Sequence, residues 1–142
     1  MTRFAGGPAE SPGFLLWHAT LRWQREMTAT LAPLGLTHVQ FVLLACTWWL
    51  ESHGGAPHQV DVAAQAGTDP KMTSDVIARL EAKGLVRREA SASDARAKVV
   101  TVTDAGATLA RQAIAAVEAT DAAFFAGVDT GSLAALARYG ER

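Results

Sequence analysis

The sequence predicts a mainly α-helical protein with one small β-hairpin. Over most of the chain, apolar residues recur at helical spacing between clear start and stop signals. Between residues 85 and 103 this pattern gives way to two short runs rich in Val, Thr and Arg, which are typical of strands. The chain has 142 residues, of which 49% are hydrophobic, so it is long enough to bury one core without disulfides.

Composition excludes several classes of protein. The chain has 13 Lys and Arg against 14 Asp and Glu, so a polycation that coats nucleic acid is excluded, although a local basic patch is not. The single cysteine, Cys46, excludes an intramolecular disulfide. The longest apolar run, residues 41–50, is too short to cross a bilayer, and no secretory signal is evident. We therefore expect a cytoplasmic protein without membrane contact.

The first two helices are predicted after a flexible arm at residues 1–12. Apolar residues return at helical spacing over residues 14–31, and the helix breakers Pro and Gly follow. Thr37 and Gln40 then have the spacing of a capping box, in which each side chain accepts a hydrogen bond from the other residue's amide. The second helix is expected to continue from this cap to about Glu51.

The third and fourth helices are separated by a tight turn. A short helix over residues 60–66 is expected to end at Gly67. Asp69 has the features of an N-cap, with Pro70 in the first helical position, and the next helix is expected to end at Gly84.

A hairpin and two more helices complete the chain. Strands are predicted at residues 85–89 and 98–103, joined by a small polar loop at 90–97 that suits a projecting hairpin. Helices follow over residues 104–126 and 132–139. Three helices followed by a two-stranded hairpin form a winged helix-turn-helix, which is the predicted fold.

The helices that flank this lobe carry apolar stripes and are too long to cover only its core. Two chains that pack these stripes together would form a two-fold dimer. We therefore divide the chain into a flexible arm (1–12), an N-terminal dimerisation helix (13–35), a winged-helix DNA-binding lobe (36–103) and C-terminal dimerisation helices (104–142).

Three motifs in this order closely resemble the MarR family of transcriptional regulators. They are the run from Leu80 to Arg88, the Asp94-Ala-Arg96 segment, and the run from Val102 to Gly106. The resemblance implies a homodimeric winged-helix repressor or activator that binds pseudo-palindromic double-stranded DNA. It also implies that a small aromatic ligand, an oxidant or a metal often releases such a protein from DNA. Of these we expect a repressor and a small aromatic effector.

The helix after Asp69 is the predicted recognition helix. Lys71, Ser74 and Asp75 share a face opposite a predicted core stripe that includes Met72. A carboxylate on that face would repel phosphate, although it can accept a hydrogen bond from the N4 amine of cytosine. A solvated helix face is the alternative interpretation. The candidate DNA contacts on this helix are Lys71, Thr73, Ser74, Asp75 and Arg79.

The predicted hairpin indicates DNA binding more strongly than the predicted recognition helix does. Between residues 71 and 98 there are seven basic and four acidic side chains, so this segment is positively charged although the whole chain is not. Asp94 can hold the Arg96 guanidinium by a charge-assisted bond, and the resemblance implies that this arginine enters the minor groove. In isolation, the pair would be interpreted as a turn aspartate beside an exposed arginine. The candidate DNA contacts in the hairpin are Arg88, Asp94, Arg96 and Lys98.

Aromatic residues indicate a candidate effector pocket between the first two helices. We expect Trp17, His18 and Trp48 to lie near it, although packing in the core or at an interface is an alternative for each tryptophan. Cys46 is expected to pack in the core rather than to act as a redox sensor. His53 and His58 lack a third firm ligand, so we expect neither a metal site nor a cofactor.

Two other functional classes compete with a DNA-binding regulator. A winged-helix protein–protein interaction module without specific DNA binding would fit Asp75 and the neutral overall charge. An enzyme is disfavoured, because the sequence has no glycine-rich phosphate loop, no paired carboxylates with a plausible role and no nucleophile elbow.

Overall fold

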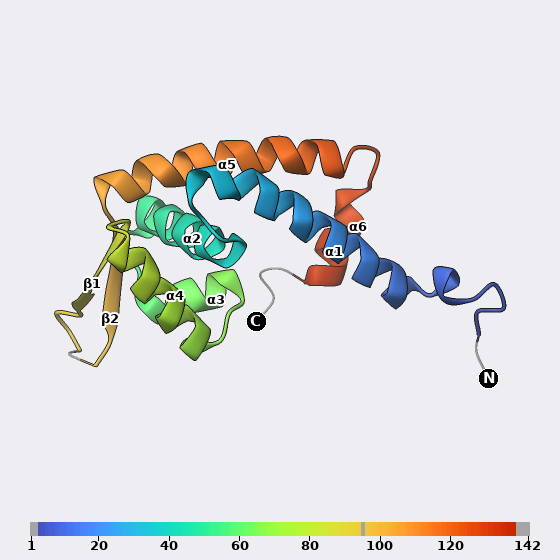
Figure 1. Ribbon diagram of the computed structural model, residues 1–142. Coiled ribbons are helices and arrows are strands. Elements are labelled where there is room, and N and C mark those ends of the chain that lie inside the picture. The colour runs from blue at the N-terminus through green and yellow to red at the C-terminus, as the bar shows by residue number, and fades with distance from the viewer. Residues whose placement is uncertain (1–2, 95, 139–142) are drawn as a thin grey trace.

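The computed structural model describes residues 3–94 and 96–138. Within them, the predicted mainly α-helical fold with a hairpin is confirmed (Figure 1). Two short 3-10 helices, Pro8–Glu10 and Ala32–Leu34, flank the first α-helix. The longer elements are α1 (Pro12–Leu31), α2 (His38–Gly54), α3 (Gln59–Ala66), α4 (Pro70–Ala82), β1 (Val86–Ala90), β2 (Lys98–Val102), α5 (Asp104–Phe124) and α6 (Thr130–Ala137).

Capping residues set the helix starts, as the sequence predicts. The Thr37 hydroxyl accepts a hydrogen bond from the Gln40 amide, and the Gln40 side chain accepts one from the Thr37 amide, both at 3.2 Å. Asp69 accepts a 2.8 Å hydrogen bond from the amide of Met72, and Pro70 follows the cap directly. Local side-chain chemistry therefore fixes the register at which α2 and α4 begin.

The ends of the chain differ from the prediction. Residues 8–10 of the expected arm form a 3-10 turn, and α1 begins at Pro12 because Ser11 caps it. The last helix begins at Thr130, where Asp129 accepts a 3.0 Å hydrogen bond from the amide of Gly131. Its predicted end, Tyr139, lies outside the described residues.

The helices form two layers. Helices α1 and α5 lie side by side, and α2 packs against both of them (Figure 1). Helices α3 and α4 continue the second layer, and the hairpin extends from the end of the molecule opposite the N-terminus. Side chains from α2, α4 and β2 are fully buried in the core, among them Leu43, Leu44, Ile77, Leu80 and Val100.

The hairpin is held by α2 and by the loop that follows it. Strands β1 and β2 pair antiparallel, with Arg88 opposite Val100. The Val100 amide also donates to the Pro57 carbonyl at 3.0 Å, and the Val102 amide donates to the Glu51 carboxylate at 2.8 Å. The base of the hairpin is therefore fixed relative to the helices.

The first helix buries only part of its predicted apolar stripe. Met27 and Leu31, near its C-terminal end, are fully buried. Phe14 and Trp17, in its N-terminal half, are exposed, and Trp17 leaves 63% of its surface open. The N-terminal half projects beyond the helical lobe (Figure 1), and within the described residues these side chains remain exposed to solvent.

Within the described residues, no single helix is long and apolar enough to span a membrane. The segments Pro12–Leu34 and His38–Gly54, which are bent at 73° to each other, are together long and apolar enough for a span, but by length and composition only.

Candidate nucleic-acid interface

The exposed face of α4 differs from the prediction only in the first turn, at Met72 and Thr73. Thr73, Val76, Ile77 and Leu80 are buried, with the spacing of one helical face. The prediction that Thr73 contacts DNA is therefore wrong: its side chain is fully buried, and its hydroxyl donates to the Asp69 carbonyl at 2.8 Å. The prediction that Met72 lies in the core is also wrong, because 45% of its surface is exposed.

Lys71 and Asp75 form an ion pair on the exposed face of α4. The Lys71 Nζ lies 2.9 Å from Asp75 Oδ2, one turn further along the helix. The hydrogen bond to Asp75, and then its charge, raise the pKa of Lys71. The ammonium is therefore charged, but a carboxylate stands beside it at the surface where phosphate would approach.

We expect Asp75→Asn to strengthen binding to any DNA duplex severalfold. The change removes a carboxylate that repels phosphate and competes for Lys71, so one more phosphate contact becomes available. The slope of log affinity against log salt should become steeper by about one. Fluorescence anisotropy over a salt series measures the affinities and this slope. Glu118→Gln on α5 is the matched control, because Glu118 is exposed and lies outside the candidate DNA surface. A loss of affinity confined to the operator would contradict this prediction and assign Asp75 to a base contact.

Arg88 joins the hairpin to α4. Its guanidinium donates to Ser74 Oγ and to Glu81 Oε1, both at 3.4 Å, and its backbone amide donates to Glu81 Oε2 at 3.1 Å. The carboxylate of Glu81 thus holds both the backbone and the side chain of Arg88. Sequence spacing did not predict this role for Glu81, because it depends on how β1 leaves the helix.

At the tip of the hairpin, Asp94 has a different role from the predicted one. Its Oδ1 accepts a 3.0 Å hydrogen bond from the backbone amide of Arg96, which is the geometry of an Asx turn. The expectation that Asp94 holds the guanidinium is therefore corrected: it fixes the turn on which the arginine stands. The Arg96 side chain is exposed, and Lys98 is exposed at the start of β2.

A series of polar contacts anchors the hairpin loop to the start of α3. The His58 amide donates to Asp61 Oδ2 at 3.1 Å, and His58 Nε2 lies 3.3 Å from the hydroxyl of Ser91. Ser91 is buried, and its hydroxyl is also 3.0 Å from that of Ser93. These contacts connect the body of the lobe to the turn that carries Arg96.

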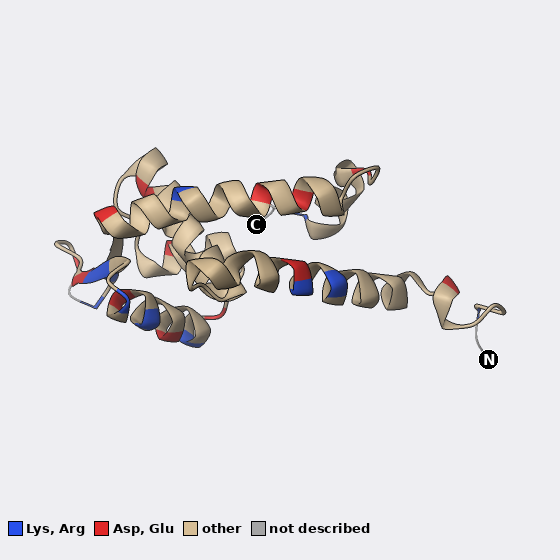
Figure 2. Ribbon diagram, turned by 45° about the horizontal axis from the view of Figure 1, so that its top comes forward, with Lys and Arg blue, Asp and Glu red and all other residues tan. Residues whose placement is uncertain are grey.

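Basic residues of α4 and the hairpin lie at one end of the molecule, with acidic residues among them (Figure 2). One of the exposed basic side chains is already hydrogen-bonded within the chain. Lys83 donates to the Gly35 carbonyl at 2.6 Å and to Gln40 Oε1 at 2.7 Å, which ties the end of α4 to the start of α2. Arg79 is exposed on α4. The candidate contacts that remain on this surface are Lys71, Ser74, Asp75, Arg79, Arg88, Asp94, Arg96 and Lys98.

The structure separates the three residues of the predicted effector pocket. Trp17 and His18 lie in the projecting half of α1, where His18 lines a hollow of about 200 Å³ with Phe14 and Leu15. Trp48 instead lies on α2, where it packs against the hydrophobic core. Within one chain, therefore, Trp48 is not part of the hollow that His18 lines.

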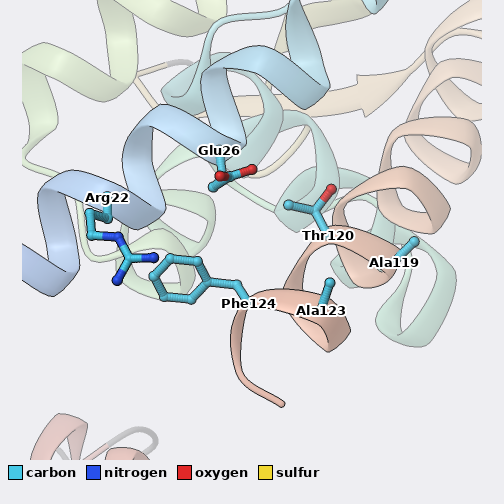
Figure 3. A pocket seen from close by; sticks show the side chains of 6 residues that line it. All are labelled: Arg22, Glu26, Ala119, Thr120, Ala123 and Phe124. Carbon is cyan, nitrogen blue, oxygen red and sulfur yellow. The ribbon is translucent and has the colours of Figure 1, made fainter.

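A cleft of about 520 Å³ opens between α1 and α5 (Figure 3). Arg22 projects from α1 over the ring of Phe124, and the guanidinium carbon lies 5.6 Å from the ring centroid. Glu26, on the same helix, and Thr120, on α5, also line the cleft. It therefore combines a cation, a carboxylate and an aromatic face.

Three helices meet at a polar junction near this cleft. The indole of Trp23 on α1 donates to Asp121 Oδ1 on α5 at 2.9 Å, and its ring stands edge-on to His38 of α2 at 5.0 Å. Burial lowers the pKa of His38, although the charge of Asp121 acts in the opposite direction. The junction links the flanking helices to the first helix of the lobe.

Cys46 and His53 are engaged in contacts with neighbouring side chains. Burial raises the pKa of the Cys46 thiol to about 11, so it is protonated at neutral pH and packs against the core. His53 stacks on Trp49 with ring centroids 4.2 Å apart. In the part of the chain that the structure describes, no group of three or more His, Cys, Asp or Glu side chains could hold a metal ion.

The sequence and fold match known transcriptional regulators. The sequence model of the MarR family matches residues 36–98. The chain is 42% identical over 120 residues to the HTH-type transcriptional regulator YdcH of Bacillus subtilis, covering 84% of this chain and 82% of that protein. It is 36% identical over 110 residues to an HTH-type transcriptional repressor of Mycobacterium tuberculosis, covering 78% and 76%. The structure of Bordetella bronchiseptica BpsR, whose DNA binding is regulated by 6-hydroxynicotinic acid, is 28% identical. It superposes with a TM-score of 0.77 over 92% of this chain and 90% of that chain.

Proposed function

Because the chain belongs to the MarR family of transcriptional regulators, we propose that it represses transcription by binding a pseudo-palindromic operator as a homodimer. The family and the relatives are regulators and not enzymes, as the sequence predicts. The observation that carries the proposal is the placement of α4 and the hairpin, whose basic residues lie together at one end of the molecule (Figure 2).

In this proposal α4 enters the major groove and Arg96 enters the adjacent minor groove. Lys71 and Ser74 lie on the outward part of α4, where they can meet base edges or phosphates. Arg88, which is held against α4 by Glu81, would contact the phosphate backbone between the two grooves. The exposed Arg96 stands on a turn fixed by Asp94, so less of its backbone freedom remains to be lost on binding.

The flanking helices supply the proposed dimer interface, within the regions 13–35 and 104–142. The N-terminal half of α1 and helix α6 lie at the same end of the molecule, away from the hairpin (Figure 1). Large apolar side chains are exposed there, namely Phe14, Leu15, Leu16, Trp17, Val128 and Leu136. A second copy related by a two-fold axis would cover them and would present two recognition helices to successive half-sites.

A small aromatic effector is proposed to act through these same helices. The hollow at His18, near Trp17, and the α1–α5 cleft at Arg22 and Phe124 both offer aromatic or apolar surface beside polar groups. Trp48 would join such a site only through packing that the dimer creates. The Trp23–His38–Asp121 junction connects these helices to α2, so it offers a route from a bound effector to the lobe.

Specific DNA binding distinguishes this function from the alternative, a protein–protein interaction module. The neutralisation of Lys71 by Asp75 is the observation that favours the alternative, because it weakens the positive potential of α4. The membership of the family and the intact hairpin arginines favour DNA. We propose that the protein acts in the cytoplasm, because its function requires access to DNA.

Titration of the purified protein against duplexes from the DNA flanking its gene tests the proposal. We expect two chains per operator duplex, affinity that falls linearly on log–log axes with rising salt, and binding at least about a thousandfold tighter than to a scrambled duplex. Anisotropy gives the affinities, and sedimentation gives the stoichiometry. Equal affinity for operator and scrambled duplexes would contradict specific regulation, and absence of salt-dependent binding would support the interaction module.

A further inference from the structure

We propose that Met72 is a specificity-determining residue that contacts the C5 methyl group of a thymine in the major groove, once in each half-site. The inference rests on the proposed function, because it requires α4 to enter that groove. In this inference Met72 recognises a base by apolar contact, in addition to any hydrogen bonds that the polar side chains of α4 make to bases.

The position of Met72 on α4 suits such a contact. It stands in the first turn of the helix, and its amide is capped by Asp69 at 2.8 Å, so its backbone is fixed. Its side chain is 45% exposed, whereas the next residue, Thr73, is fully buried. The first turn of a recognition helix is the part that approaches base edges in helix-turn-helix complexes. A large apolar side chain is thus held at the leading end of the helix.

The polar neighbours of Met72 are already engaged within the chain. Lys71 and Asp75 are paired at 2.9 Å, and Ser74 accepts a hydrogen bond from Arg88 at 3.4 Å. These groups must share or break those contacts to hydrogen-bond with a base. The side chain of Met72 has no hydrogen bond to give up, because its burial against DNA only removes apolar surface from water.

The chemistry of the major groove identifies the target. Among the four bases only thymine carries a methyl group there, and apolar side chains distinguish it by van der Waals contact. The unbranched, polarizable side chain of methionine adapts to the position of that methyl group. Burying one methyl group corresponds to about a fourfold gain in affinity for each half-site.

Deoxyuridine, which lacks only the methyl group, provides the test. The wild-type chain first selects an operator from a random duplex library, and the selected duplex is then resynthesised with deoxyuridine in place of each thymine in turn. Affinities are measured for the wild type, Met72→Ala, Met72→Leu and Val60→Ala. Val60 is the matched control, because it is an apolar residue of α3 with 74% of its surface exposed. Thermal unfolding of each variant checks that it is folded.

We expect one thymine in each half-site at which deoxyuridine weakens wild-type binding about fourfold. At that position Met72→Ala should bind both duplexes equally, whereas Met72→Leu and Val60→Ala should keep the preference for thymine. The proposal is overturned if no thymine shows a methyl effect, or if the effect survives in Met72→Ala. Those results leave the proposed function intact, because a specific operator was selected. Failure to select any operator would overturn both.

Discussion

Gly106→Ala is expected to lower the free energy of unfolding by about 3 kcal/mol, the upper part of the usual range for overpacking. Gly106 is buried in the first turn of α5, and an added Cβ would overlap the carbonyl oxygen of Leu85. That carbonyl cannot easily move, because it accepts a 3.0 Å hydrogen bond from the amide of Thr103. The Leu85 amide is also held, by the Leu80 carbonyl at 3.0 Å. The substitution must therefore displace α5 from Leu85, the residue that precedes β1.

Urea-induced unfolding at a fixed protein concentration measures this loss. Gly54→Ala is the matched control, because Gly54 is the last residue of α2 and a Cβ there would meet nothing within 4 Å. In a helix this second substitution should be neutral or stabilising by up to about 1 kcal/mol. Equal stability of Gly106→Ala and the wild type would show that α5 does not approach the hairpin this closely.

Features that depend on neighbouring residues were predictable from the sequence. The capping box at Thr37 and the N-cap at Asp69 use hydrogen bonds that span three residues, so spacing alone locates them. The spacing of apolar residues changes after Gly84 from the helical pattern to one typical of strands, and this local signal locates the hairpin. The fold followed from these local signals together with the order of the elements.

Features that depend on tertiary contacts were not predictable in this way. Met72 and Thr73 exchange their expected environments because the core selects the face of α4, and a polar threonine is acceptable there once its hydroxyl donates to Asp69. The attachment of Arg88 to Glu81 depends on the angle at which the strand leaves the helix. Asp94 was expected to bind a side chain, but the tight loop brings the amide of Arg96 closer to it.

Arg96→Ala is expected to weaken operator binding by about 1–3 kcal/mol while leaving the helical content unchanged. The side chain is exposed at the tip of the hairpin, so its removal affects no core packing. In the minor groove, a guanidinium gains from the strong negative potential of narrow A·T-rich segments. The loss should therefore be larger for operators with A·T-rich flanks than for those in which the flanks are G·C-rich. Anisotropy at constant salt gives the affinities, and circular dichroism gives the helical content.

Two sets of matched variants separate the groove contact from general electrostatics and from loop geometry. Arg111→Ala removes an equal charge from an exposed position on α5 and should change affinity little. Asp94→Asn keeps the acceptor for the Arg96 amide, whereas Asp94→Ala removes it and frees the turn. We therefore expect Asp94→Ala to weaken binding, by less than Arg96→Ala, and Asp94→Asn to bind at least as tightly as the wild type. If Arg96→Ala and Arg111→Ala weakened binding equally, the hairpin would contribute charge alone. If Asp94→Asn were as weak as Asp94→Ala, the carboxylate would act on the guanidinium after all, as the sequence first indicated.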